Sequence, residues 1–310
     1  MKRGLPWVRT MRGFTLIEMV MVIIILGVIG AIVAVFMKKP VDAYFDTGRR
    51  AALTDVADTA VRRIGRDVRR ALPNSLRLPL AGDQCIEFIP TKTGGRYRAL
   101  PDTAPGAPAP GELDFAAVDA SFNMLGDNAA LPPDQRIAAG DLIAVYNLGI
   151  AGANAYNQDN TDTVSAAPGL VPSRVVGTTT YGTETSIITA GRLTPYPLAS
   201  PNNRFHVIPA AEHVVTYVCA NLGENTGKLY RYARPLVAPY ATPASCPAEP
   251  LPAGTPVLAR NVTACSFVYT DVVNNNAFLH RNGLLQVRLE LTRANETVSL
   301  YHEVNVDNTP

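Results

Sequence analysis

The feature that most constrains this chain is an uninterrupted apolar run near its N-terminus. Met19–Met37 contains nineteen consecutive uncharged, almost wholly apolar residues. A helix of that length reaches about 28 Å, close to the hydrocarbon thickness of a bilayer. The first 13 residues carry four basic side chains and no acid, and such flanks stay in the cytoplasm (Lys2, Arg3, Arg9, Arg12). The run therefore predicts one transmembrane helix over about 16–37, with the body of the chain on the far side of the membrane.

Two simpler segments share part of this pattern. A secretory signal peptide has an apolar core of only about 7–15 residues, followed by a small-x-small cleavage site. Here Lys38, Lys39 and Pro40 follow the run instead, so a signal peptide fits poorly. A plain signal anchor has the same hydropathy as the observed run, and hydropathy alone does not distinguish it.

A single carboxylate, Glu18, lies at the start of the apolar segment. An acid at membrane depth is unfavourable unless it is paired, so it indicates a function and a partner. Cleavage between Gly13 and Phe14 would place the new ammonium group of Phe14 four residues before Glu18, on the same helix face. Between chains offset along a filament, the same pair would join neighbouring subunits. The alternative is that Glu18 lies at headgroup depth and stays solvated.

The basic leader, the sequence GFTLIE over Gly13–Glu18 and the long apolar run together resemble the N-terminal signature of type IV prepilins. The resemblance implies that a prepilin peptidase removes residues 1–13 and methylates the amino group of Phe14. It implies that Glu18 then recruits the subunit onto a growing filament. The implied partners are this peptidase, other major and minor pilins bound through the N-terminal helix, and the inner-membrane assembly platform. It implies no catalysis by this chain and no cofactor.

A second helical pattern follows the apolar run. Between Val41 and Leu72, apolar residues recur at spacings of three and four, and the remaining positions carry mainly arginine and aspartate. We interpret the charged positions as a solvated helix face. Pro40 predicts a kink or a short break, because it lacks the N–H that a helix interior uses. The pattern predicts one long helix over 14–74, with a transmembrane half and an amphipathic half.

Residues 75–310 change to the shorter periodicity of β-strands. The clearest case is Leu284–Thr292, where apolar and polar residues alternate, and Val298–Val306 repeats the pattern after a turn at Arg293–Glu296. Residues at about 100–203 are rich in Pro, Gly, Ala, Asn and Thr and predict long loops with sparse strands. The whole predicts an α+β, pilin-like fold, in which an antiparallel sheet head packs on the apolar face of the long helix.

The four cysteines are Cys85, Cys219, Cys246 and Cys265, and none forms a CxxC pair. In an exported head, an even number of cysteines favours two disulfides, and three connectivities are open. Pairing Cys219 with Cys246 is favoured, since it closes a loop of 28 residues. The alternative is four buried thiols that act as small apolar side chains.

Several other classes of site have little support. Without the leader the chain is slightly acidic, which gives no footprint for a nucleic acid. The histidines do not have the spacing of a metal site, and we predict no metal (His206, His213, His280, His302). The segment Asn157–Asp162 contains carboxylates and amides that suit calcium, but it lacks the Gly and Glu of an EF-hand loop. We interpret it as a solvated loop.

The large head favours a low-abundance minor pilin over a major pilin. Head motifs at Val215–Cys219, Leu229–Tyr232 and Asn261–Tyr269 resemble minor pilins of mannose-sensitive haemagglutinin (MSHA) pilus biogenesis, the O-type subunit in particular. The end of the helix, Arg62–Leu72, also resembles the J-type minor pseudopilin of type II secretion. A pilus-tip adhesin that uses the loops at 100–203 is a further alternative, and a signal-anchored periplasmic enzyme a remote one.

Overall fold

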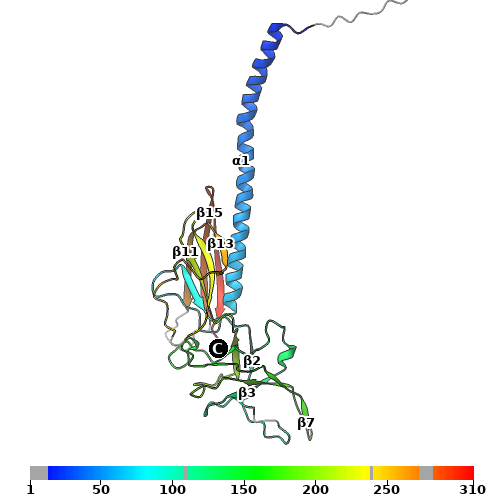
Figure 1. Cartoon of the computed structure of the whole chain (residues 1–310), viewed down its shortest axis with the longest axis vertical. Helices are drawn as coiled ribbons and strands as arrows, with labels where there is room; N and C mark the ends of the chain where they lie inside the picture. The colour runs from blue at the N-terminus through cyan, green and yellow to red at the C-terminus, as the bar shows by residue number, and fades with distance from the viewer. Residues whose placement is uncertain (1–12, 108–110, 238–239, 272–281) are drawn as a thin grey trace, which may run out of the picture. The chain divides into compact units, whose positions relative to one another are not determined.

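A computed structural model describes residues 13–107, 111–237, 240–271 and 282–310. The chain divides into two compact units, Met1–Ala52 and Leu53–Pro310. Helix α1, Leu16–Arg69, supplies most of the first unit and continues into the second (Figure 1). The helix runs through Pro40, so the predicted break is absent. One missing hydrogen bond does not interrupt a helix whose neighbouring turns remain bonded. α1 ends where Leu72 N–H turns to donate to Ile89 O at 2.7 Å.

Two antiparallel sheets form the part of the head that packs on α1. The first has the strand order β1-β11-β12-β13 and comprises β1 (Cys85–Phe88), β11 (Val214–Ala220), β12 (Lys228–Arg234) and β13 (Val257–Arg260). The second has the order β14-β15-β16 and comprises β14 (Val262–Asp271), β15 (Asn282–Arg293) and β16 (Glu296–Asp307). Figure 1 shows β11, β13 and β15 alongside the C-terminal part of α1.

The main core lies between α1 and the inner faces of these two sheets. The helix contributes buried residues from Leu53 to Val68, among them Ala57, Ala60 and Ile64, and the strands contribute a row of aliphatic side chains. The fold is therefore α+β with antiparallel sheets packed on the helix, as the sequence predicted. The packed face begins at Leu53 and not at Val41, since Val41, Tyr44 and Phe45 are exposed.

The closing hairpin of β15 and β16 confirms the alternation seen in the sequence. The two strands pair in register over their whole length, from Asn282↔Asp307 to Arg293↔Glu296. Apolar residues of β15 are buried at every second position. The two turn residues, Ala294 and Asn295, both have positive φ, at 51° and 66°. Positive φ at both positions is the geometry of a tight hairpin turn that matches the twist of the strands.

The region 100–203 is more structured than the sequence predicted. Its described residues, 100–107 and 111–203, contain seven short strands: β3 (Ser121–Leu125), β4 (Leu142–Val145), β5 (Thr161–Thr163), β6 (Gly169–Val171), β7 (Arg174–Val176), β8 (Thr179–Tyr181) and β9 (Glu184–Ile188). It also holds short 3-10 helices at Asn128–Ala130 and Ala155–Asn157. With β2 (Thr93–Arg96) and β10 (Arg204–Ile208), these strands make sheets of order β2-β10-β4-β5, β3-β9-β6 and β7-β8. They surround a second apolar cluster that includes Phe122, Ile143 and Phe205.

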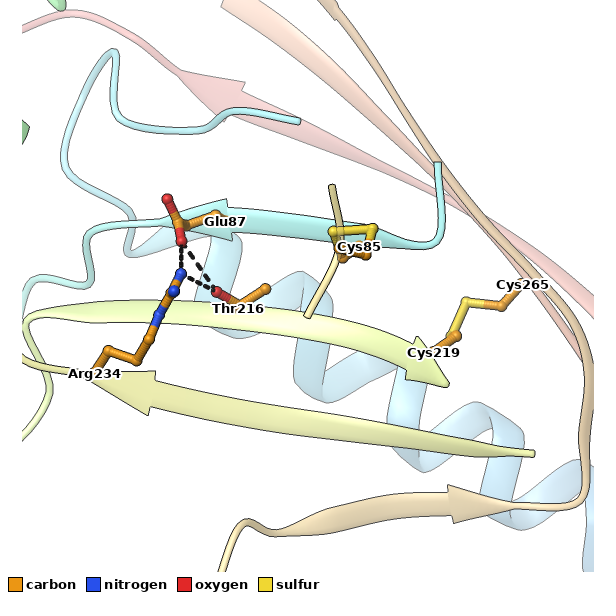
Figure 2. Close-up of a disulfide and its surroundings, with 7 residues drawn as sticks. Cys85, Glu87, Thr216, Cys219, Arg234 and Cys265 are labelled. Carbon is orange, nitrogen blue, oxygen red and sulfur yellow. Dashed lines mark hydrogen bonds and ion pairs between the residues drawn. A yellow bond between two sulfur atoms is a disulfide. The ribbon is translucent and has the colours of Figure 1, made fainter. Parts of the chain in front are cut away.

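A buried carboxylate, Glu87 on β1, connects several segments of the head. Arg77 donates to its Oε1 at 2.7 Å, and Arg234 and Thr216 bond its Oε2 (Figure 2). Tyr240 donates to the same Oε2 at 3.1 Å, and burial raises the pKa of that phenol to about 12, so the donor proton is retained. A buried carboxylate is stable only with such a complete set of donors. These bonds hold β1, β11, β12 and the loops around residues 77 and 240 together.

The disulfides differ from the pairing that the sequence favoured. Cys85 bonds Cys246 and Cys219 bonds Cys265, with Cα–Cα distances of 5.6 and 6.3 Å. Figure 2 shows the second of these bridges linking β11 to β14. In the β1–β11 ladder Cys85 lies opposite Val218, so Cys219 points to the other face of the sheet. The inner face leads Cys219 to Cys265 in the main core, whereas Cys246 packs with Cys85 on the outer face.

Peptide mapping of the oxidised protein without reduction is expected to recover the Cys85–Cys246 and Cys219–Cys265 peptides. Replacing Cys219 and Cys265 together by alanine should lower the free energy of unfolding by about 4 kcal/mol, the loop-closure entropy for a separation of 46 residues. Chemical denaturation would measure this loss. A disulfide-linked peptide that contains Cys219 and Cys246 would contradict the structure.

Candidate functional site at the N-terminus

The start of α1 is held by a reciprocal pair of hydrogen bonds between Thr15 and Glu18. The Glu18 N–H donates to Thr15 Oγ1 at 3.3 Å, and the Thr15 N–H donates to Glu18 Oε2 at 3.4 Å. This is a capping box, which satisfies backbone N–H groups that have no partner inside the helix. Gly13 and Phe14 precede the helix in irregular chain, and Phe14 is 79% exposed. The predicted cleavage position therefore lies outside the helix, two residues before the box.

Glu18 thus has a role in this chain that the sequence analysis did not assign. The signal was present, since Thr-x-x-Glu before an apolar run is the usual sequence of a capping box. One carboxylate oxygen accepts the Thr15 N–H. A carboxylate offers about four acceptor positions over its two oxygens. Capping the helix in its own chain therefore leaves Glu18 able to accept a further donor.

The segment that follows is apolar on every side. The side chains of residues 16–37 are exposed in the isolated chain, and Glu18 is the one charged residue among them. Among the described residues, α1 is the one helix that is long and apolar enough to cross a membrane. A helix with apolar residues all round is stable in lipid or when surrounded by other helices. This segment therefore fits an inner-membrane anchor.

The far end of α1 is fixed to the head by Asp67. Its Oδ2 accepts the Tyr217 hydroxyl at 2.7 Å and the Arg231 Nε–H at 2.8 Å. The guanidinium of Arg231 also makes two bonds to Glu212, at 2.7 and 2.6 Å. Burial, together with the Asp67 carboxylate, raises the pKa of Tyr217 well above its ordinary value. Bonds to Glu212 and Asp67 raise the pKa of Arg231, so both donors keep their protons at any physiological pH.

Asp67→Asn should destabilise the head by about 1–3 kcal/mol, because a buried guanidinium loses a charged acceptor. Thermal unfolding of the full chain in detergent micelles measures this change. Asp58→Asn is the matched control, since the Asp58–Arg62 pair on the same helix is largely exposed and is expected to contribute less than about 0.5 kcal/mol. Equal losses in the two variants would show that Asp67 does not hold the helix to the head.

The histidines considered as metal ligands lie on separate elements, and one of them already accepts a hydrogen bond. His206 lies on β10, His213 precedes β11 and accepts the Leu236 N–H, and His302 lies on β16. His280 lies outside the described residues. Among the residues that the structure describes, no group of three or more His, Cys, Asp or Glu side chains is placed to hold a metal ion.

The segment Asn157–Asp162 is only partly the solvated loop that the sequence predicted, since Asn157 and Gln158 are exposed and the residues after Asp159 are not. Asn160 and Asp162 are buried, the latter on strand β5. The guanidinium of Arg192 binds the backbone carbonyls of residues 158, 159 and 161. A calcium ion would need such carbonyl oxygens as ligands, and here an arginine occupies them.

A comparison with known families supports the N-terminal assignment. The family described as the prokaryotic N-terminal methylation motif matches residues 8–34, which include Gly13, Phe14 and Glu18. No curated protein and no solved structure matches the chain. The match supports a type IV pilin-like or pseudopilin-like prepilin, processed by a prepilin peptidase and anchored in the inner membrane. It covers the N-terminal segment alone.

Proposed function

We propose that this chain is a minor type IV pilin-like subunit, a structural component of a filament without catalytic activity of its own. The observation that carries the proposal is the GFTLIE sequence, Gly13–Glu18, directly before the uncharged run Met19–Met37 of α1. The methylation-motif match over residues 8–34 agrees with it. The N-terminus is cytoplasmic and the head periplasmic before assembly, and the subunit then enters a pilus outside the cell.

The assembly step follows from the chemistry of the new N-terminus. Cleavage after Gly13 converts the amide nitrogen of Phe14 into an ammonium group, which methylation leaves positively charged. In an apolar surrounding this charge requires a carboxylate. Glu18 caps its own helix with one bond and retains acceptor positions for the Phe14 ammonium of a neighbouring subunit. Pairing the two charges drives the helix from lipid into the bundle of helices at the filament centre.

The head supports a minor subunit of an MSHA-type pilus, because motifs on β11, β12 and β14 resemble the O-type minor pilins. A minor pseudopilin of type II secretion of the J type is the second candidate, favoured by the arginine-rich end of α1 at Arg62–Leu72. A tip adhesin is the third, and it would use the strands and loops of 100–203. Deletion of these loops would abolish attachment in an adhesin while filaments still form.

Processing is tested by the intact mass and N-terminal sequence of the protein taken from its native membrane. Wild type is expected to begin at N-methylated Phe14, whereas Gly13→Ala is expected to retain residues 1–13. A Cβ added at Gly13 would meet no atom within 4 Å, and the residue is not in the helix, so the substitution leaves the fold intact. A wild-type chain that begins at Met1 in cells with an active prepilin peptidase would refute the proposal and leave a signal-anchored protein.

The role of Glu18 is tested by Glu18→Gln beside Glu18→Ala. Glutamine keeps the capping bond to the Thr15 N–H but has no charge, whereas alanine removes both. Loss of filament incorporation in both variants, with leader cleavage retained, is the expected result. It would assign assembly to the carboxylate charge. Incorporation of Glu18→Gln at the wild-type level would show that Glu18 serves only as a helix cap.

A further inference from the structure

A groove of about 700 Å³ lies beside the C-terminal part of α1, within the unit Leu53–Pro310. One wall carries Arg62, Arg66 and Arg69 of α1, and His302 of β16 forms the other side. Gly65 brings the two elements together, because a Cβ there would lie 3.3 Å from Nε2 of His302. The groove therefore runs between the helix and strand β16, with arginines on one wall.

The charge of this groove is unbalanced. Asp58 is the one acid in its lining, and it bonds Nε of Arg62 at 2.7 Å. Arg66 and Arg69 are exposed and make no ion pair with any residue in the described parts of the chain. Arginine is suited to bidentate binding of carboxylates. The groove thus offers at least two unpaired guanidinium groups to an acidic ligand.

The strand that borders the groove has an open edge. Within the described residues, β16 is the last strand of the order β14-β15-β16 and pairs only with β15. It is twelve residues long and has no proline, and its pairing has no bulge. Proteins usually protect such an edge, because its free N–H and C=O groups can pair with another chain. A strand edge without such protection can instead be covered by a partner chain.

We propose that this groove binds an extended acidic segment of another polypeptide, which adds to the free edge of β16 as a further strand. Residues at alternate positions of a strand lie about 6.8 Å apart on one face. Arg62 and Arg66 are about 6 Å apart along the helix axis. β15, the neighbour of β16, runs alongside α1 (Figure 1), so carboxylates at alternate positions of the added strand face successive arginines.

Charge also identifies the kind of chain that can occupy the groove. None of the segments outside the described residues, 1–12, 108–110, 238–239 and 272–281, contains an aspartate or glutamate. Edge-to-edge pairing of β16 with β16 of a second copy would bring two arginine rows together, which is unfavourable. The occupant is therefore a different polypeptide with acidic residues at alternate positions. The site lies wholly in Leu53–Pro310, so its test is independent of the N-terminal processing proposed above.

Fluorescence anisotropy with the full chain in detergent micelles tests this site. The probe is a labelled ten-residue peptide, blocked at both ends, in which glutamate alternates with valine and threonine. The double variant Arg66→Glu/Arg69→Glu is expected to weaken binding at least about tenfold. The matched control Arg63→Glu/Arg70→Glu makes the same charge change at two exposed positions outside the groove, Arg63 on α1 and Arg70 directly after its end, and should bind like wild type. Circular dichroism confirms that both variants are folded.

Two modified peptides separate strand addition from simple attraction of an anion. N-methylation at alternate residues blocks the N–H groups on one edge of a strand, so one of the two methylation registers should lose binding and the other should keep it. A peptide of the same composition with consecutive glutamates should bind weakly. Equal binding in both registers, or equal loss in the two double variants, would overturn the proposal and leave a non-specific anion site.

Discussion

The structure of the head depends on one packing interaction, the contact between the C-terminal part of α1 and the inner faces of two sheets. Small helix residues, Ala57 and Ala60 in the core and Gly65 against β16, allow the strands to approach the helix closely. Burial of aliphatic side chains on both sides supplies the main stabilising free energy. The Cys219–Cys265 bridge joins the two sheets, and the bonds of Asp67 fix α1 to the first of them, so covalent and polar contacts reinforce the apolar one.

The two ends of α1 are suited to different surroundings. Residues 16–37 are apolar on all sides and suit lipid or a bundle of helices, whereas the face that begins at Leu53 is buried in the head of its own chain. Glu18 is the exception in the apolar part, and its capping bond to Thr15 explains how a carboxylate is accommodated there before any partner arrives. A charge held in this way is pre-positioned for a second donor, which is the property that the proposed assembly step requires.

Local periodicity predicted the helix and the closing hairpin well. The pairing of cysteines that are distant in the sequence was predicted poorly. The alternation in Leu284–Thr292 gave the β15–β16 hairpin, because one face of that strand must be buried. The apolar run and the Thr-x-x-Glu sequence mark the start of α1. The disulfides were mispredicted because loop length suggested Cys219–Cys246, whereas the pleat of β11 directs Cys219 inward. Region 100–203 has strands of three to five residues, too short for a clear period.

The bridge between β11 and β14 would have a mechanical consequence in the filament proposed above. The helix segment from Leu53 onward rests on both sheets, and Cys219–Cys265 joins these sheets covalently. Tension along the helix is therefore shared by two sheets that cannot separate at this point without breaking a sulfur–sulfur bond. Resistance to force is a property of the unfolding rate. A head constructed in this way is expected to keep its two helix-bearing sheets together when the helix is pulled.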